Sequence, residues 1–520
     1  MKLFNKNKIN IQRIILRSIP ILFTLSFLLA QNKESEILYK EYCSGCHGID
    51  GNGNGDYSYL LYPKPRDLTN GVFKIKSTSA GNPPTDQDLF STIHDGMPGT
   101  AMPSFSYLKD GEIKTLVDIV KEFSGINNQN VDPLIIPNEL PPTDELIALG
   151  RSIYTEVGCN MCHGNIGKGD GPSSNQLKDT QGFPIIPKDF TSGVYLGGGT
   201  KRDLYLRFVC GMDGTPMPSF GNLAELLGKP KAEESKLAWA LVHYVKSLEI
   251  INSDVSNGQP ENGILIAAKT NRSIKPEEFL YGKGSLWEGA VSYSVPISRL
   301  WQSTSVNYQM VNVQALYNSK YIAIKMEWED QSQDQELYRV QDFQDGGAIQ
   351  FTPDGTKGFH GMGSENHPTD IWFWKAEWQM RTNEKTESDI VLAYANRISD
   401  SNVETYPQLM NDVAYLAGRD AGNINSETAK VSPVENVMAF GPQTVTSFPK
   451  NEQKVMGRGI WDGQKWQVVF VRKLKSDSKR KVNIKKGESI PIAFAIWNGS
   501  EKDRNGQKMV STWYELELKD

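Results

Sequence analysis

The strongest constraint on this 520-residue chain is an internal repeat in its first half. The motif Cys-Ser-Gly-Cys-His at 43–47 is followed by a glycine-rich loop and, 59 positions after Cys43, by Met102 in a Met-Pro step. The motif Cys-Asn-Met-Cys-His at 159–163 is followed by the same features, with Met217 lying 58 positions after Cys159. Self-similarity of this kind predicts two small domains of one type in tandem. We call residues 35–125 the first repeat and residues 140–250 the second repeat.

A Cys-x-x-Cys-His run is typical of covalent haem attachment, because its two thiols add to the vinyl groups while the adjacent histidine reaches the iron. Two copies at matched spacing predict two haems c. Zinc held by two Cys-x-x-Cys pairs is the chemical alternative. It is disfavoured because each pair has its own histidine and the pairs lie more than 100 residues apart. The predicted attachment cysteines and iron-ligating histidines are Cys43, Cys46, His47, Cys159, Cys162 and His163.

The two repeats resemble class I cytochrome c domains, which are small and all-α. In that family a methionine from a late loop supplies the second iron ligand. Each repeat offers two candidates, Met97 or Met102 in the first and Met212 or Met217 in the second. The family ligand usually stands in a Met-Pro-x-Phe segment, and this resemblance selects Met102 and Met217. His94 is expected on the surface, and His243 on the closing helix is expected to be solvated.

The N-terminus has the layout of a signal peptide at 1–30. Several lysines and arginines precede an apolar run at 19–30, whose 12 residues fall short of the roughly 20 that span a bilayer. We expect export to the periplasm or an equivalent compartment, with an uncleaved membrane anchor as the alternative. Of five cysteines only Cys210 lies outside the haem motifs, so we expect no disulfide and a partly buried free thiol at Cys210.

The periodicity of the sequence changes from 3.6 to 2 after a polar linker at 252–262. Apolar residues alternate along 321–328, 492–497 and 514–518, and 468–471 is a continuous apolar run. Such segments, separated by Gly, Asp and Asn turns, predict an antiparallel β-sandwich at 263–520, which we call the C-terminal domain. The expected fold is multidomain: two small all-α cytochrome c domains followed by a mainly antiparallel β-sandwich.

Segments spread over 324–513 resemble the haem-binding gamma subunit of ethylbenzene dehydrogenase and its relatives, which include the corresponding subunits of dimethylsulfide dehydrogenase, selenate reductase and nitrite oxidoreductase. They include Ile-Trp-Phe-Trp-Lys-Ala at 371–376 and Gly-Gln-Lys-Met-Val-Ser-Thr-Trp at 506–513. That family holds a non-covalent haem b between a methionine and a lysine. The matching residues are Met362 and Lys508, with His360 and His367 as fallback ligands. A lysine can bind iron only as the neutral amine, so its pocket must be dry. By themselves these residues could equally be core methionine and solvated lysine.

These features predict an electron-transfer subunit with two haems c and one haem b. The resemblance implies a molybdopterin catalytic subunit and an iron–sulfur subunit as partners, with a further cytochrome or membrane complex receiving or supplying electrons. A net charge of −5 argues against nucleic acid. The alternatives are a carbohydrate- or ligand-binding β-sandwich fused to a dihaem cytochrome c, and an enzyme. No nucleophile–base pair or carboxylate cluster supports the enzyme.

Overall fold

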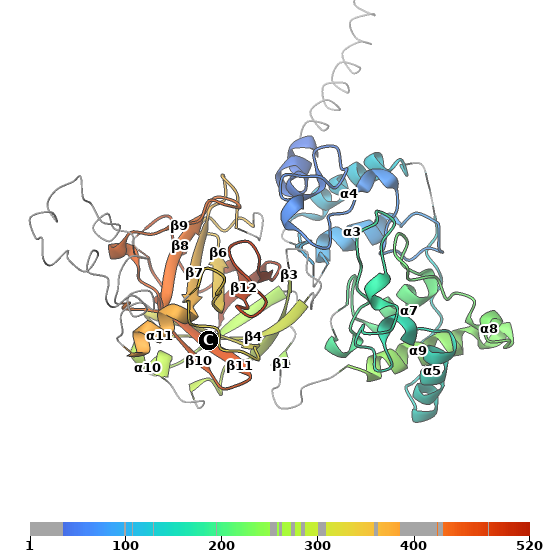
Figure 1. Cartoon of the computed structure of the whole chain (residues 1–520). Helices are drawn as coiled ribbons and strands as arrows, with labels where there is room; N and C mark the ends of the chain where they lie inside the picture. Colours follow the sequence, from blue (N-terminus) through green and yellow to red (C-terminus); the bar gives the residue numbers. More distant parts are fainter. Residues whose placement is uncertain are drawn as a thin grey trace, which may run out of the picture.

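The computed structural model describes residues 35–519 except 98, 99, 107, 128, 130, 194, 250–256, 259, 261, 262, 272–275, 282–285, 300–307, 338, 358–361, 385–423, 425–429 and 477. The expected signal peptide at 1–30 lies outside this range. Among the residues described, no helix is both long and apolar enough to cross a membrane. Figure 1 shows the first repeat in blue, beside the second repeat in green and the C-terminal domain in yellow to red.

Helices form both repeats, and equivalent side chains start and anchor them. In the first repeat Thr85 and Asp88 make a capping box, and in the second Thr200 and Asp203 make the same box. The first-repeat elements are α2 (Ser44–His47), η1 (Ser58–Leu60), η2 (Leu68–Asn70), α3 (Asp86–Asp95) and α4 (Asp110–Ser124). The second-repeat elements are α5 (Asp144–Glu156), α6 (Asn160–His163), η3 (Ser174–Gln176), η4 (Phe190–Ser192), α7 (Lys201–Cys210), α8 (Leu223–Leu226), η5 (Lys231–Glu233) and α9 (Glu234–Ser247).

The closing helices bury an apolar stripe. In α4, Ile113, Leu116, Val117 and Val120 recur at helical spacing and are buried. Helix α9 crosses α5 at Gly150, where any larger residue would collide with the Ala240 carbonyl group. Each repeat therefore has its own small apolar core.

Strands dominate the C-terminal domain. They are β1 (Asn257–Gly258), β2 (Ile264–Lys269), β3 (Ser292–Arg299), β4 (Tyr308–Tyr317), β5 (Tyr321–Glu329), β6 (Gly346–Phe351), β7 (Thr369–Lys375), β8 (Val434–Ala439), β9 (Thr446–Ser447), β10 (Met456–Trp461), β11 (Lys465–Lys473), β12 (Ser489–Trp497), β13 (Met509–Val510) and β14 (Tyr514–Lys519). Short helices α10 (Pro276–Tyr281), α11 (Ala376–Glu384) and η12 (Lys450–Glu452) lie between them.

The strands form a curved sheet in the order β10-β11-β5-β4-β2-β14-β12-β6-β7-β8-β9, with β3 also pairing with β4. The pairs β1–β3, β2–β14 and β2–β4 are parallel, and the other described strand pairs are antiparallel. Side chains from β5 and β11 share one buried core with side chains from β6, β7 and β12. The two ends of the sheet thus pack face to face, and the predicted fold class is confirmed.

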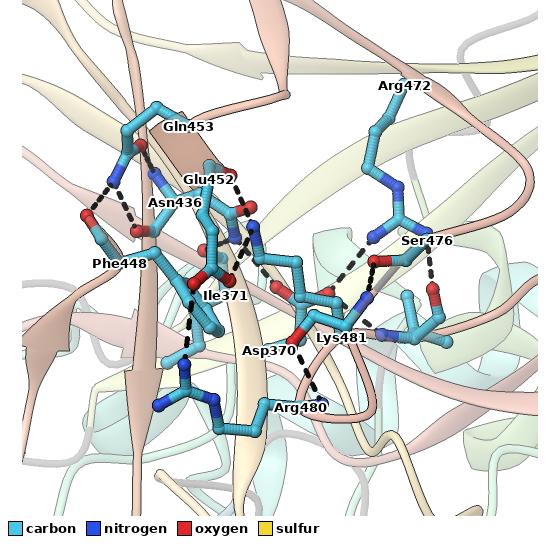
Figure 2. Close-up of polar contacts among 12 residues, drawn as sticks. Asp370, Ile371, Asn436, Phe448, Glu452, Gln453, Arg472, Ser476, Arg480 and Lys481 are labelled. Carbon is cyan, nitrogen blue, oxygen red and sulfur yellow. Dashed lines mark hydrogen bonds and ion pairs between the residues drawn. The ribbon is translucent and has the colours of Figure 1, made fainter. Parts of the chain in front are cut away.

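A buried polar network joins the two layers (Figure 2). The Arg472 guanidinium on β11 lies 3.2 Å from an Asp370 carboxylate oxygen on β7 and 5.0 Å from the Trp372 ring centre. Asp370 also accepts hydrogen bonds from the Asn436 amide at 2.7 Å and the Val482 backbone N–H at 3.0 Å. Because Asp370 and Arg472 are both almost fully buried, this pair fixes how the layers meet.

Candidate functional site

The first haem motif begins on the short helix α2, which orients His47. Its Nδ1 lies 2.9 Å from the Arg66 carbonyl oxygen. A carbonyl can only accept, so Nδ1 carries the proton and Nε2 keeps a free lone pair for a metal. Burial lowers the pKa of His47, which favours the neutral imidazole that metals require. Cys43 and Cys46 are free thiols whose pKa burial raises to about 12.

The second motif repeats this arrangement on α6. Nδ1 of His163 lies 2.9 Å from the Lys188 carbonyl oxygen, so Nε2 is again the free nitrogen. Phe190 stacks on the imidazole with ring centres 4.3 Å apart. Burial lowers the pKa of His163 and raises that of Cys159 to about 12. Cys159 and Cys162 are also free thiols.

The candidate methionines occupy equivalent places in the two repeats. The backbone N–H of Met102 donates to Thr100 Oγ1 at 3.1 Å, and that of Met217 donates to Thr215 Oγ1 at 3.1 Å. Met102 packs against the same apolar cluster as Cys43, and Met217 packs against the cluster of Cys159. The geometry therefore brings each candidate methionine to the core that also holds its motif.

Sequence reasoning missed three partly buried basic residues, of which Arg66 and Lys188 bind the two histidines through their backbone carbonyl groups. Burial lowers the pKa of Arg66, and it lowers the pKa of both Lys74 and Lys188 to about 8. Cations that lose hydration in this way are stabilised by an anion, and haem carries two propionate carboxylates. The available signal was the repeated Pro-Arg/Lys-Asp step at 65–67 and 187–189. The thiols, the neutral imidazoles and these cations together fit haem c.

The C-terminal domain has a cavity of about 680 Å³ on its outer face, within the usual size for a cofactor site. Because side chains alternate along a strand, β12 sends Ile492 and Ile496 into the core and Ala493 and Ala495 towards the cavity. Small and branched apolar side chains make a broad floor that could receive a flat aromatic ring system. This floor comprises Ala348, Ile371, Phe373, Val437, Ala493 and Ala495.

Met362 and Lys508 both line this cavity. Met362 has a φ of 154°, a backbone conformation that side-chain-bearing residues rarely adopt and that tends to mark functional sites. Lys508 is 5% exposed, and burial alone lowers its pKa to about 8. Its Nζ lies 5.0 Å from the Trp497 ring centre. A methionine sulfur and an easily neutralised amine beside an apolar floor fit haem b.

Of the two fallback ligands, only His367 lies among the described residues. His360 lies outside the described residues. His367 does not line the cavity; its Nδ1 lies 2.9 Å from Asp354 and its Nε2 lies 3.4 Å from Glu41 of the first repeat.

His243 and Cys210 are both more deeply buried than the sequence predicted. His243 is buried rather than solvated, because its Nε2 lies 2.7 Å from the carbonyl oxygen of Leu140, in the segment just before α5. Cys210 is a fully buried free thiol at the end of α7, and burial raises its pKa to about 11.

Two protein families match parts of this chain. Residues 286–509 match the family described as ethylbenzene dehydrogenase. Residues 30–118 match the family described as cytochrome c oxidase, cbb3-type, subunit III. The chain therefore carries a cytochrome c domain and, in its C-terminal half, an ethylbenzene dehydrogenase gamma-like haem b domain.

Individual relatives carry related descriptions. A protein of Haloferax mediterranei, named as a candidate haem subunit (ORF7) of respiratory nitrate reductase, is 22% identical over 44% of this chain and 64% of its own length. Dimethylsulfide dehydrogenase subunit gamma of Rhodovulum sulfidophilum is 30% identical over 22% of this chain and 46% of its own length. The chain thus spans less than two thirds of these relatives. A chain in the Kuenenia stuttgartiensis reducing HAO-like protein complex Kustc0457/Kustc0458 is 39% identical, with a TM-score of 0.39, over 42% of this chain and 96% of that one.

Proposed function

We propose that this chain is the electron-transfer haem subunit of an exported molybdenum-dependent oxidoreductase complex and that it holds two haems c and one haem b. The observation that carries the proposal is the convergence of Met362 and Lys508 on one apolar cavity in a chain that also has two haem c motifs. Bound haem supplies a one-electron couple between ferric and ferrous iron.

Each proposed ligand has a defined task. His47 and Met102 hold the first haem c, His163 and Met217 hold the second, and Met362 and Lys508 hold haem b. The Arg66 and Lys188 carbonyl groups fix the tautomer of the two histidines. The dry pocket around Lys508 favours its neutral amine over the ammonium form.

The partners are implied by the family resemblance and belong to the proposal. A molybdopterin catalytic subunit and an iron–sulfur subunit would exchange electrons with the C-terminal domain. A further cytochrome or membrane complex would exchange them with a haem c domain. The charged-then-apolar segment before residue 31 supports export.

Apolar variants of the two proposed ligands test the assignment of the haem b site in the C-terminal domain. Met362→Leu and Lys508→Leu remove the donor atom but keep an apolar side chain, so each variant should lose most of its haem b and retain both haems c. Loss of an iron ligand removes well over the 1.4 kcal/mol that corresponds to a tenfold change in affinity. The measurement is the ratio of b-type to c-type haem in the pyridine haemochrome spectrum of the full-length protein.

Matched controls are present in the same domain. Met456→Leu on β10 changes a half-buried methionine outside the cavity, and Lys485→Leu changes an exposed lysine paired with Glu488 at 3.0 Å. Both should keep the wild-type haem ratio. Wild-type haem b in the Met362 and Lys508 variants would refute the ligand assignment.

A further inference from the structure

We infer that the first repeat, and not the second, forms the outer wall of the C-terminal cavity. The first repeat is then the cytochrome c domain that lies next to the proposed haem b site. This inference rests on the proposed function. Tyr59 and Leu60 of the first repeat line the cavity together with Met362 and Lys508. Leu61 is 2% exposed and belongs to the same apolar cluster as Val437 and Trp497.

The contact reaches the haem motif itself. Cys46 and Met362 pack against this one cluster, although they belong to different domains. The Tyr57 ring lies so close to Gly45, inside the motif, that a Cβ there would stand 2.9 Å from it. The Tyr57 hydroxyl lies 3.9 Å from the position a Cβ would take at Gly441 of the C-terminal domain. Tyr57 therefore spans the space between the first motif and the cavity rim.

Polar contacts surround this apolar centre. The Gln443 amide donates to the Tyr59 hydroxyl at 2.7 Å, and His367 approaches Glu41 at 3.4 Å. An apolar centre with a polar rim is the usual composition of a specific protein interface. The rim contacts are partly exposed, so most of the stabilisation comes from the buried centre.

Comparison of the repeats shows why only one of them fits. The turns η1 and η3 occupy equivalent positions, because Ser58 and Ser174 each donate a backbone hydrogen bond to the glycine three residues before, at 2.9 Å. Where the first repeat has Tyr59 and Leu60, the second has Asn175 and Gln176, which are exposed. The apolar pair is thus specific to the repeat that touches the cavity.

The other side of the first repeat is bound to the second. Lys76 is 1% exposed and pairs with Asp213, in the loop that leads to Met217. The Arg207 guanidinium donates to the Lys76 carbonyl oxygen at 3.4 Å. The equivalent of Asp213 in the first repeat is Pro98, so this pair also distinguishes the repeats. Figure 1 shows the first repeat beside both the second repeat and the C-terminal domain.

The resulting order gives one electron path. The C-terminal domain gives up one electron and is oxidised as the first repeat is reduced, and the first repeat then reduces the second. In the opposite direction the same steps run in reverse. No bond is made or broken in either direction, and the second repeat is the end at which an external carrier exchanges electrons.

A residue exchange between repeats tests this inference. The full-length variant Tyr59→Asn/Leu60→Gln gives the first repeat the side chains of the second. It should release haem b to apomyoglobin about tenfold faster than wild type, because a polar side chain replaces the partly buried Leu60 in the apolar wall, and a tenfold change corresponds to about 1.4 kcal/mol. The midpoint potential of haem b should also fall, since water gains access to the site. The control Asn175→Ala/Gln176→Ala should match wild type in both measurements.

The outcomes separate the two proposals. Wild-type protein without any haem b would refute the proposed function. Wild-type protein with haem b, combined with an unchanged release rate and potential in Tyr59→Asn/Leu60→Gln, would overturn the inference and leave the function standing. If that variant does not fold, as judged by its haem c content, Leu60→Ala provides the same comparison with a smaller change.

Discussion

Met362 and Lys508 differ from ordinary core residues in ways that only the folded chain reveals. Met362 has a strained backbone and faces an apolar cavity, and Lys508 is buried at 5% exposure. Neither property follows from local sequence, because each depends on strands that are distant along the chain. Only the family resemblance drew attention to these two residues. The haem c motifs are different, because two thiols and a histidine within five residues already define their chemistry.

Asp345 is a buried acid that makes the C-terminal domain sensitive to pH. It is 0% exposed and accepts hydrogen bonds from the backbone N–H groups of Gly499 at 2.9 Å and Asp334 at 2.7 Å and from the Trp466 indole at 3.0 Å. Burial, reinforced by the nearby Asp330 carboxylate, raises the pKa of Asp345 to about 7.

A raised carboxyl pKa in the folded state gives stability that is fully present below pH ~4 and is lost as the pH rises through 7. We expect the free energy of unfolding to fall by about 4 kcal/mol over this range, at about 1.4 kcal/mol for each pKa unit. Urea unfolding at pH 5 and pH 7.5, followed by tryptophan fluorescence, measures the part of this fall that lies between pH 5 and 7, which is about 3 kcal/mol. Asp345→Asn should flatten the dependence, whereas the exposed Asp462→Asn should retain it. An equally steep fall in Asp345→Asn would assign the effect to other groups.

The elements show how far sequence patterns can determine this fold. Alternation along β5 and β14 predicted strands, and the motif spacing predicted paired helical domains. The two faces of β12 are both apolar, however, so periodicity alone could not tell that Ile492 and Ile496 face the core while Ala493 and Ala495 face the cavity. The solvated state expected for His243 was wrong, because the segment just before α5 packs against α9 through the Leu140 carbonyl group.

The buried ion pair between Asp370 and Arg472 joins the two layers of the C-terminal domain. Among contacts between elements, its loss should lower the free energy of unfolding most. Arg472→Met would leave the Asp370 carboxylate buried without its cation, which typically costs about 3–5 kcal/mol. Replacing both partners, in Asp370→Val/Arg472→Met, should recover part of this loss. Thermal and urea unfolding of the full-length protein provide the comparison.

A surface ion pair supplies the control for the buried Asp370–Arg472 pair. Arg480 lies 3.5 Å from Glu452 and its side chain is 52% exposed, so Arg480→Ala should cost less than about 1 kcal/mol. Equal losses in Arg472→Met and Arg480→Ala would mean that the buried pair does not hold the layers together.

At the scale of the whole molecule, three domains are arranged so that one of them touches both others. Sequence comparison of the repeats could find the two haem c domains, but not which one adjoins the cavity. That choice depends on Tyr59 and Leu60, whose partners lie hundreds of residues away. In the proposed order, the first repeat connects the cavity with the second repeat.

The haem stoichiometry of purified full-length protein tests the central claim most directly. The measurement is a pyridine haemochrome spectrum, in which c-type and b-type haem are resolved, on protein matured with covalent haem attachment. The account predicts two haems c and one haem b in each chain. Two haems c with no haem b would contradict it and would favour a ligand-binding β-sandwich fused to a dihaem cytochrome c.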